Sequence, residues 1–556
     1  MTNYIDAFAF KNMILCASAA LQSNIQAINE LNVFPVPDGD TGTNMGLTLS
    51  TAVTELNKND FSSLDKAADC VANALLRGAR GNSGVILSLL FRGISKRLKG
   101  MDTAGPVEFA GAMCDGVDAA YKAVMKPAEG TILTVSRLAS AAAKKAAEVG
   151  ADFDGMLECA VVAAEEALED TVNQNPVLKK AGVIDAGGKG YCVILSAMLQ
   201  SFRGEFTMPD EAALSQSGPA KAFNSKLLEE ITFTFDTVFI VSKKAETSIA
   251  SFRTYLDSIG DSIVINEDDE IFKVHVHTDI PGEVLSEAQK YGSLELAKIE
   301  NMVTQAKQQA AGEDAQSTDD LDEVEKELEN SADPDEPEKE YGVVSVCAGA
   351  GMADVFRQLG CDGIITGGQT MNPSTQDILA VVNKTNAATV FVLPNNKNII
   401  MAAEQCVPLS EKKVIVIPSK TVPQGVTAML NFMPDGQADE ITAAMTDSLS
   451  TVHTAMVTYA ARDSDFDGHT IHAGEYLALL DGALVGSFTS ISTLFKELSW
   501  AIDDLNPEFI TMYYGEDVDE EDAASVSNTF KGNFPDAEVT VINGGQPVYF
   551  YMISIE

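Results

Sequence analysis

Basic side chains and long apolar runs are scarce in this chain of 556 residues. Its 38 lysines and arginines stand against 81 aspartates and glutamates, which gives a formal net charge of −43 at pH 7. Nucleic acid and anionic membrane surfaces repel such a chain, so the composition excludes both as partners. No uncharged stretch reaches the roughly 20 apolar residues that span a bilayer, and we therefore expect no integral membrane segment.

Cysteine pairs and targeting signals are missing as well. The eight cysteines stand apart, none belongs to a C-x-x-C pair, and most lie in apolar runs. Isolated cysteines of this kind are typical of small buried side chains in a reducing compartment. The first residues show no basic region followed by an apolar core, so no secretory signal is expected. These absences predict a cytoplasmic protein.

The familiar phosphate-binding motifs are absent, but another candidate is present. The chain has neither a Walker A pattern nor the motif set of protein kinases. Residues 38–44 read DGDTGTN, so that Asp38 and Asp40 flank Gly39. Mg²⁺ is usually held by one or two carboxylates together with substrate phosphates, and glycine lets the backbone turn tightly between the two acids. The alternative for this composition is a polar β-turn or a loose calcium loop.

Three further glycine-containing segments lie in the same, mainly helical part of the chain, at residues 77–84, 129–134 and 184–191. The first and the last lead directly into apolar runs. A glycine-rich turn that opens a helix favours an anion, because free backbone N–H groups and the helix dipole point at it. One such cluster is a weak signal, since glycines also end helices. Together with residues 38–44 they predict the rims of one shared phosphate site.

These motifs also carry a resemblance to a known family. Residues 32–45, 79–87 and 185–188 resemble the bacterial fatty acid kinase catalytic subunit. The N-terminal domain of that family is similar to the nucleotide-binding L subunit of dihydroxyacetone kinases. Residues 544–549 (GGQPVY) look like the C-terminal signature of the family, so the resemblance extends over essentially the whole chain.

The resemblance implies a reaction, cofactors and a partner. The reaction is ATP-dependent phosphorylation of a carrier-bound fatty acid to acyl phosphate, which feeds exogenous fatty acid into phospholipid synthesis. The cofactors are ATP and Mg²⁺, and the partner is a fatty-acid-binding carrier protein; a homodimer stays open. The alternatives are a dihydroxyacetone-type kinase acting on a small polyol and a non-enzymatic regulator that senses nucleotide or lipid.

The matching motifs also imply the site residues. Asp38 and Asp40 would hold Mg²⁺, and Thr43 would join them in the catalytic group. The residues expected to bind ATP are Thr41, Gly42, Thr43, Asn44, Asn82, Ser83, Gly130, Asp185 and Gly187. The L subunit has a further aspartate a few residues before its carboxylate pair, and this chain offers Asn32 in that neighbourhood. Residues 1–203 contain no histidine, but a carboxylate acceptor is ionised at neutral pH and needs no general base.

Composition divides the chain into four stretches. Residues 1–203 are rich in alanine, leucine and charged residues and predict helices, for example at 64–76 and 136–149. The resemblance implies that they form an antiparallel α-helical barrel with nucleotide bound across its mouth. Residues 206–311 alternate strand and helix patterns and predict a small α+β domain.

The remaining two stretches differ sharply from each other. Residues 313–340 hold fourteen acids and two bases, which predicts a flexible acidic linker because like charges repel and little apolar surface is available to bury. Residues 341–556 alternate short β-branched runs with helix-length segments, which predicts a parallel sheet followed by a second lobe. This two-lobed α/β domain resembles the fatty-acid carrier proteins of the same kinase system.

Two smaller motifs lie outside the helical part. His275 and His277 share one face of a predicted strand, and the resemblance implies a zinc site there, with Asp236 at the place of the family's cysteine. A carboxylate can ligate zinc, but a hydrogen-bonded structural histidine pair is an equal alternative. Residues 367–375 (GGQTMNPST) follow a strand where open α/β sheets bind ligands. Their alternatives are an anion site, a partner contact and a helix cap, of which we favour a partner or structural role.

Overall fold

A computed structural model describes residues 3–32, 39–124, 127–206, 233–244, 249–267, 271–301, 337, 339–368, 372–466 and 469–556. The chain divides into two compact units. One unit comprises Met1–Met208 and Glu336–Glu556, and the other comprises Pro209–Asp335. Asp38 and nearly all of the predicted linker lie outside the described residues. Among the helices that the structure describes, none is long and apolar enough to cross a membrane.

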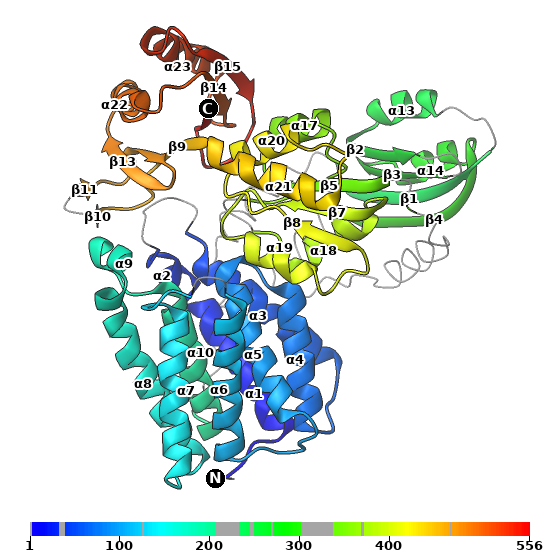
Figure 1. The fold of residues 1–556 in the computed structure, drawn as a ribbon. Helices are drawn as coiled ribbons and strands as arrows, with labels where there is room; N and C mark the ends of the chain where they lie inside the picture. Colours follow the sequence, from blue (N-terminus) through cyan, green and yellow to red (C-terminus); the bar gives the residue numbers. More distant parts are fainter. Residues whose placement is uncertain are drawn as a thin grey trace. The chain divides into compact units, whose positions relative to one another are not determined.

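The N-terminal part of the first unit is mostly helical, as predicted, with short loops and an isolated β-bridge between Ile5 and Ala104 (Figure 1). The helices are α1 (Ala7–Ser23), α2 (Ile25–Asn29), α3 (Thr41–Lys58), α4 (Leu64–Gly78), α5 (Gly81–Leu98), α6 (Pro106–Ala123), α7 (Ile132–Glu148), α8 (Phe153–Gln174), α9 (Pro176–Ala181) and α10 (Ala186–Arg203). The expected helices at 64–76 and 136–149 are α4 and α7. From α3 to α8 each long helix packs against the next, and α10 packs against both α8 and α1.

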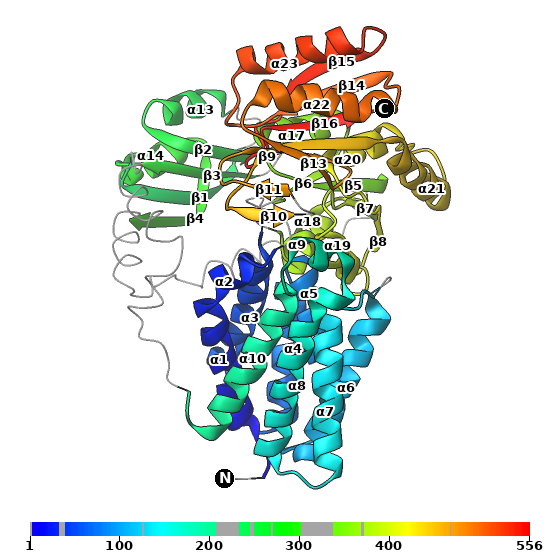
Figure 2. The ribbon, with the colours of Figure 1, turned by 90° about the vertical axis from the view of Figure 1, so that its left-hand side faces the viewer.

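One end of this helical part gathers the beginnings of α3, α5, α7 and α10 (Figures 1 and 2). Close approaches between glycines and neighbouring helices hold these ends together. A Cβ atom at Gly190 of α10 would lie 2.7 Å from Met45 Sδ of α3, and one at Gly84 of α5 would lie 2.4 Å from Thr48 Oγ1. The glycine-rich motifs therefore pack helix against helix at the end where four helix dipoles present their positive poles.

The C-terminal part of the first unit begins with the predicted parallel sheet. Its four strands lie in the order β6-β5-β7-β8, and all three pairings are parallel. The strands are β5 (Lys339–Cys347), β6 (Gly363–Thr366), β7 (Ala387–Leu393) and β8 (Lys413–Val416), and the helices are α17 (Ala350–Gln358), α18 (Thr375–Lys384), α19 (Ile400–Cys406), α20 (Val422–Leu430) and α21 (Ala438–Ser448). Because β5 starts at Lys339, the last two residues assigned to the linker form strand.

A second, six-stranded sheet follows in the order β13-β12-β9-β16-β14-β15. Its elements are β9 (His453–Tyr459), β12 (Tyr476–Leu480), β13 (Ala483–Phe488), β14 (Phe509–Tyr514), β15 (Glu538–Asn543), β16 (Tyr551–Ile555), α22 (Ile491–Asp503) and α23 (Glu520–Asn533), with the short pair β10 (Ser464–Phe466) and β11 (His469–Ile471) beside it and a 3₁₀ turn (Leu449–Thr451) before β9. All pairings except β14 with β15 are antiparallel.

The helical and C-terminal parts of this unit share one apolar core. Helices α18 and α19 pack against α4 and α5. Buried side chains of both parts, such as Leu75 and Leu87 on one side and Ile378 and Ala402 on the other, belong to the same cluster. Burial of a full aliphatic side chain contributes about 1.5–3 kcal/mol, so this continuous core fixes the C-terminal part against the helices.

The second unit is a small α+β fold, as predicted from the alternating pattern. Its antiparallel sheet has the order β2-β3-β1-β4. The elements are β1 (Phe235–Lys243), α13 (Ala250–Asp257), β2 (Gly260–Glu267), β3 (Ile271–Thr278), α14 (Pro281–Ala288) and β4 (Gly292–Asn301). Phe239, Phe252 and Phe272 are buried in its core, with the rings of Phe252 and Phe272 5.8 Å apart.

Candidate functional site

The start of α3 is held by one asparagine. Asn29, at the end of α2, accepts hydrogen bonds at Oδ1 from the N–H groups of Gly42 (2.7 Å) and Thr43 (3.3 Å), and its Nδ2 donates to Thr43 Oγ1 (3.0 Å). The Thr41 hydroxyl donates to Asn32 Oδ1 (2.9 Å). The two threonine hydroxyls that sequence assigns to nucleotide thus also anchor the loop, and Asn32 braces it where the L subunit has an aspartate.

Gly42 is predicted to bind nucleotide, and the structure gives a packing reason for a glycine at this position. A Cβ atom there would lie 2.5 Å from the Ile25 carbonyl oxygen and 3.0 Å from Asn29 Oδ1. Backbone cannot yield as a flexible side chain does, so the start of α3 would have to shift.

We expect Gly42→Ala to lower the free energy of unfolding by about 1–3 kcal/mol and to weaken nucleotide binding. Gly111→Ala on α6 is the matched control, because its Cβ would meet the end of the Arg97 side chain no closer than 3.3 Å. Thermal unfolding and nucleotide titration of both variants check this. Equal behaviour of the two variants would contradict the packing explanation.

The start of α5 lies beside the start of α3. A Cβ at Gly81, which has φ of +58°, would lie 2.5 Å from Asn44 Nδ2. The N–H of Arg80 donates to Thr48 Oγ1 (3.2 Å), and that hydroxyl donates to the Asn44 carbonyl (2.6 Å). The structure therefore brings Asn44 next to the segment that carries Asn82 and Ser83, the first turn of α5. These residues form the first group of the candidate site together with Asp40, the N-cap of α3.

Gly130, Asp185 and Gly187 form a second group, at the starts of α7 and α10. A Cβ at Gly187 would lie 3.4 Å from Ile132 Cβ. Gly130, with φ of +73°, donates its N–H to Thr134 Oγ1 (2.8 Å). Asp185 caps α10 by accepting the Gly188 N–H (2.7 Å). This group shapes two helix starts.

Asp185 has an unusual protonation equilibrium. Burial raises its pKa to about 6, against the opposing effect of backbone hydrogen bonds from Gly188 and Ile132. A carboxyl whose pKa is higher in the folded than in the unfolded chain binds more protons when folded, so its contribution to stability is lost as pH rises through this range.

We therefore expect the free energy of unfolding of the wild type to fall, relative to Asp185→Asn, as pH rises from about 4 to about 6, and the difference to stay constant above that. Asparagine retains an N-cap acceptor, and the comparison at each pH cancels the other titrating groups. Denaturant unfolding of both proteins checks this. A difference that does not change with pH would contradict the burial of Asp185.

A third contribution comes from the C-terminal part and was not expected as a site residue. Asn372, within the loop before α18, is 1% exposed, and its Nδ2 donates to Asp40 Oδ2. Arg80 Nη1 donates to the Asn372 carbonyl (2.8 Å), and Arg80 Nη2 pairs with Asp377 (3.3 Å). Ser374 caps α18 together with Asp377. This confirms the helix-cap alternative for residues 367–375.

The residues in this place suit a hard cation such as Mg²⁺, which takes oxygen ligands. Asp40 provides a carboxylate, and two buried carboxamide oxygens, Asn82 Oδ1 and Asn372 Oδ1, have no hydrogen-bond partner within the described part of the chain. Buried polar atoms are nearly always satisfied, and an orphan indicates a missing ion, water or ligand. Among the described residues, no three His, Cys, Asp or Glu side chains cluster. The second predicted carboxylate, that of Asp38, lies outside the described residues.

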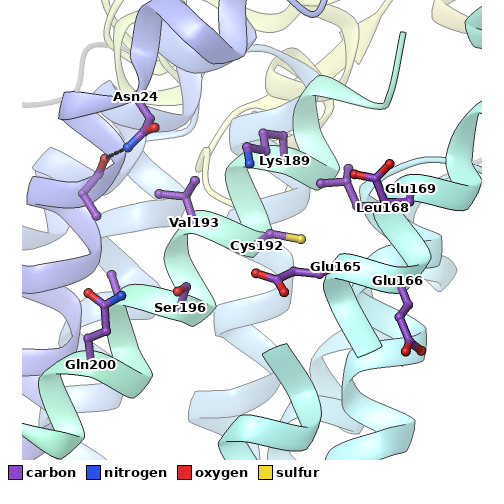
Figure 3. A pocket seen from close by; sticks show the side chains of 12 residues that line it. Asn24, Glu165, Glu166, Leu168, Glu169, Lys189, Cys192, Val193, Ser196 and Gln200 are labelled. Atoms are coloured by element: carbon purple, nitrogen blue, oxygen red, sulfur yellow. Dashed lines mark hydrogen bonds between the residues drawn. The ribbon is translucent and has the colours of Figure 1, made fainter. Parts of the chain in front are cut away.

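A separate hollow of about 700 Å³ lies between α1, α8 and α10 (Figure 3). Of the described residues that line it, Glu165, Glu166 and Glu169 are acidic and Lys189 is basic. Burial raises the pKa of the Cys192 thiol there to about 12, with the nearby Glu165 carboxylate adding to the effect. A phosphate chain would be repelled by the three acids, and the thiol is not a nucleophile at neutral pH. These features favour the helix starts over this hollow as the nucleotide site.

The place where open α/β sheets bind ligands is nearly filled in the C-terminal part. The cavity beside Gly367, Gly368 and Asn395 measures about 20 Å³, room for about one water molecule. The signature at residues 544–549 closes it: the Met352 N–H donates to the Gly544 carbonyl (3.0 Å), and Gln546 Nε2 donates to the Tyr513 carbonyl (2.9 Å). An acyl chain does not fit this cavity.

In the second unit, the strand register pairs Asp236 with His277 and Val238 with His275. The three residues of the predicted zinc site thus come from neighbouring strands. The side chains of Asp236 and His275 are outside what the structure describes, so their contacts add nothing to the prediction.

Comparison with known proteins matches these three parts of the chain. Residues 35–200 match the model of the DAK2 domain. Residues 232–309 match the FakA-like middle domain of fatty acid kinases, and residues 342–556 match the FakA-like C-terminal domain. Each match falls on one of the folded parts described above.

Whole-length relatives and solved structures were also found. Protein YloV of Bacillus subtilis is 40% identical over 562 residues, with 99% of each chain covered. An uncharacterized protein of Staphylococcus saprophyticus is 36% identical over 567 residues, with 100% of both chains covered.

Two solved structures are similar to parts of the chain. The dihydroxyacetone kinase of C. freundii is 20% identical with a TM-score of 0.28 and 35% of each chain covered. The fatty acid kinase B3 protein of Streptococcus pneumoniae, loaded with linoleic acid, is 10% identical with a TM-score of 0.28, covering 39% of this chain and 99% of that one. From the three domain matches and the identity along its whole length, the chain belongs to the FakA-like family of fatty acid kinase proteins.

Proposed function

We propose that the chain transfers the γ-phosphoryl group of ATP to the carboxylate of a fatty acid held by a separate fatty-acid-binding protein. The product is an acyl phosphate, which feeds exogenous fatty acid into phospholipid synthesis. The observation that carries the proposal is the meeting of the starts of α3 and α5 around Asp40, beside oxygens of Asn82 and Asn372 that have no partner among the described residues. Positive helix ends and oxygen ligands together suit Mg²⁺ and phosphate.

In this proposal the residues of the site position and neutralise the phosphates. Asp38 and Asp40 would hold Mg²⁺, which would offset the charge of the phosphates. The N–H groups at the starts of α3 and α5 face the phosphates, with Thr41, Thr43, Asn44, Asn82 and Ser83 on these turns. Gly130, Asp185 and Gly187 border the opposite side, where Asp185 fixes the start of α10. Phosphoryl transfer needs little covalent help beyond this.

The acceptor follows from what the helical part lacks. A polyol hydroxyl needs a base to take its proton, whereas a fatty-acid carboxylate is ionised at neutral pH. Residues 1–203 contain no histidine. The 20 Å³ cavity beside the parallel sheet is too small for an acyl chain, which supports delivery of the acyl chain by a separate carrier.

The domain arrangement belongs to the same proposal. Residues 1–203 form an antiparallel helical barrel, which is supported by the packing of α10 against α1. Residues 341–556 help to dock the carrier, and residues 313–340 separate the middle domain, residues 206–311, from them. Docking raises the effective concentration of the carboxylate at the phosphate site.

Comparison of three acceptor conditions tests the proposal. The purified full chain with ATP and Mg²⁺ should release ADP when a fatty acid loaded on its binding protein is added. Dihydroxyacetone should give no more ADP than the buffer control. Release with dihydroxyacetone would support a polyol kinase, and no release with either acceptor would support a regulator without enzyme activity.

Zinc in the middle unit is a separate proposal, supported by the register that pairs Asp236 with His277. If His275, His277 and Asp236 hold zinc, they form one site with three protein ligands and one open position. The purified chain should then carry about one zinc per molecule. His277→Ala should lose it, while His472→Ala, a change in the other unit, should retain it. Absence of zinc from the wild type would contradict the proposal and favour a structural histidine pair.

A further inference from the structure

We propose that Asn372, from the C-terminal part, is a ligand of the Mg²⁺ bound with nucleotide at the start of α3. This inference rests on the proposed function, because it assigns a further residue to the same phosphate site. Asn372 lies 332 positions from Asp40 in the chain, yet its Nδ2 donates to Asp40 Oδ2. The C-terminal part would then complete the metal site of the helical part.

The first argument is the state of the Asn372 side chain. It is 1% exposed, and its Oδ1 has no hydrogen-bond partner among the residues that the structure describes. Leaving a buried acceptor unsatisfied lowers the stability of the folded chain. The other half of the carboxamide meets the oxygen of Asp40 that is expected to hold the cation. A half-turn of the carboxamide exchanges its oxygen and nitrogen, which turns Oδ1 toward a cation at Asp40 and moves Nδ2 to the place where Oδ1 now lies.

The second argument is how firmly the loop is held in place. Arg80 bonds to the Asn372 carbonyl (2.8 Å) and to Asp377 (3.3 Å), so one guanidinium fixes the loop at both ends of its turn. The Thr375 N–H donates to the Ala79 carbonyl (3.1 Å). These contacts join the start of α5 to the start of α18. A ligand must be positioned to within a fraction of an ångström for Mg²⁺, which demands near-ideal octahedral geometry.

The third argument is a separate contact between the same two parts. Arg462, in the second lobe, donates from Nη2 to the Asn32 carbonyl, and Asn32 accepts the Thr41 hydroxyl. The C-terminal part therefore touches the loop of Asp40 from two sides, through Asn372 and through Arg462. If the C-terminal part contributes a residue to the site, it should contact the loop of Asp40 directly, in addition to sharing the apolar core with the helices.

The contact could instead hold Asp40 away from the metal, and the two roles differ in the sign of one measurement. An asparagine that ligates the cation strengthens metal binding, whereas one that only occupies Asp40 weakens it. Replacement by alanine therefore lowers metal affinity in the first case and raises it in the second. Replacement by aspartate keeps an oxygen ligand in the first case, but in the second it places two like charges side by side.

The test is titration of the full-length wild type, Asn372→Ala and Asn372→Asp with Mg²⁺·ADP by calorimetry, and with Mn²⁺ by electron paramagnetic resonance. Asn383→Ala is the control, because Asn383 is an exposed asparagine on α18 that accepts a bond from Ser410. We expect Asn372→Ala to weaken Mg²⁺·ADP binding by about 10–100-fold, Asn372→Asp to bind at least as tightly as the wild type, and the control to be unchanged.

Unchanged or tighter binding in Asn372→Ala would overturn the inference. If the alanine variant fails to fold, the aspartate variant decides alone: Mg²⁺·ADP binding weaker than wild type in a folded protein overturns it. Failure of the proposed function looks different, since the wild type would then release no ADP with the loaded fatty-acid-binding protein, whatever the effect of Asn372 on Mg²⁺·ADP binding. Binding by the wild type with no change in either variant refutes the role of Asn372 and leaves the proposed function standing.

Discussion

Asp40→Ala is expected to lower Mg²⁺-dependent turnover by about 10²- to 10³-fold or more, the usual loss when one preorganised charge-stabilising group is removed. Asp40 combines three features: it is the N-cap of α3, it faces Asn372, and it lies beside the start of α5. Removal of its carboxylate should loosen the Mg²⁺ that offsets the charge of the phosphates. Asp38→Ala should have an effect of the same order. Initial rates at saturating ATP and Mg²⁺ check both.

The control for this prediction is Asp118→Ala, which removes an exposed carboxylate from α6. It should turn over like the wild type. The Asp40 side chain is not part of the apolar core, so Asp40→Ala should unfold within a few degrees of the wild type. Wild-type turnover in the Asp40 variant, in the presence of ample Mg²⁺, would refute its assignment to the metal.

Omission of the fatty-acid-binding protein is expected to reduce acyl phosphate formation by about 10²-fold or more, because docking supplies an effective concentration in the millimolar range and a free long-chain acid is poorly soluble. Where the parallel sheet would bind a ligand, the described residues leave no room for an acyl chain. Rates with loaded carrier and with the same total fatty acid in detergent micelles check this. Equal rates in the two assays would contradict a carrier-delivered acceptor.

Much of the local structure could be predicted from sequence pattern. The helices expected at residues 64–76 and 136–149 are α4 and α7, and the short β-branched runs expected after residue 341 form a parallel sheet, because these patterns are local. The second lobe was predicted less completely. Strands β9 and β16, which lie in the middle of its sheet, were not predicted. Strand β16 is the last element of the chain and pairs with β9 almost a hundred residues earlier, a pairing without any local signal.

The site was predicted in the same uneven way. Motif residues at the starts of α3 and α5 come together because glycines permit close helix packing. Asn29 was missed, because an asparagine at a helix end is common and forms no motif with residues 38–44. Arg80 stood within the glycine-rich motif, but its partner is Asn372. That contact joins two parts of the chain far apart in sequence, so only the folded arrangement reveals it.

The central claim is phosphorylation of a carboxylate, and the chemical identity of the product tests it most directly. Acyl phosphates react with hydroxylamine to give hydroxamates, whereas phosphate esters of polyols do not. The full chain, ATP, Mg²⁺ and a fatty acid on its binding protein should yield fatty acyl hydroxamate in an amount equal to the ADP released. Release of ADP without hydroxamate, or with phosphorylated dihydroxyacetone as the product when that acceptor is present, would contradict the account.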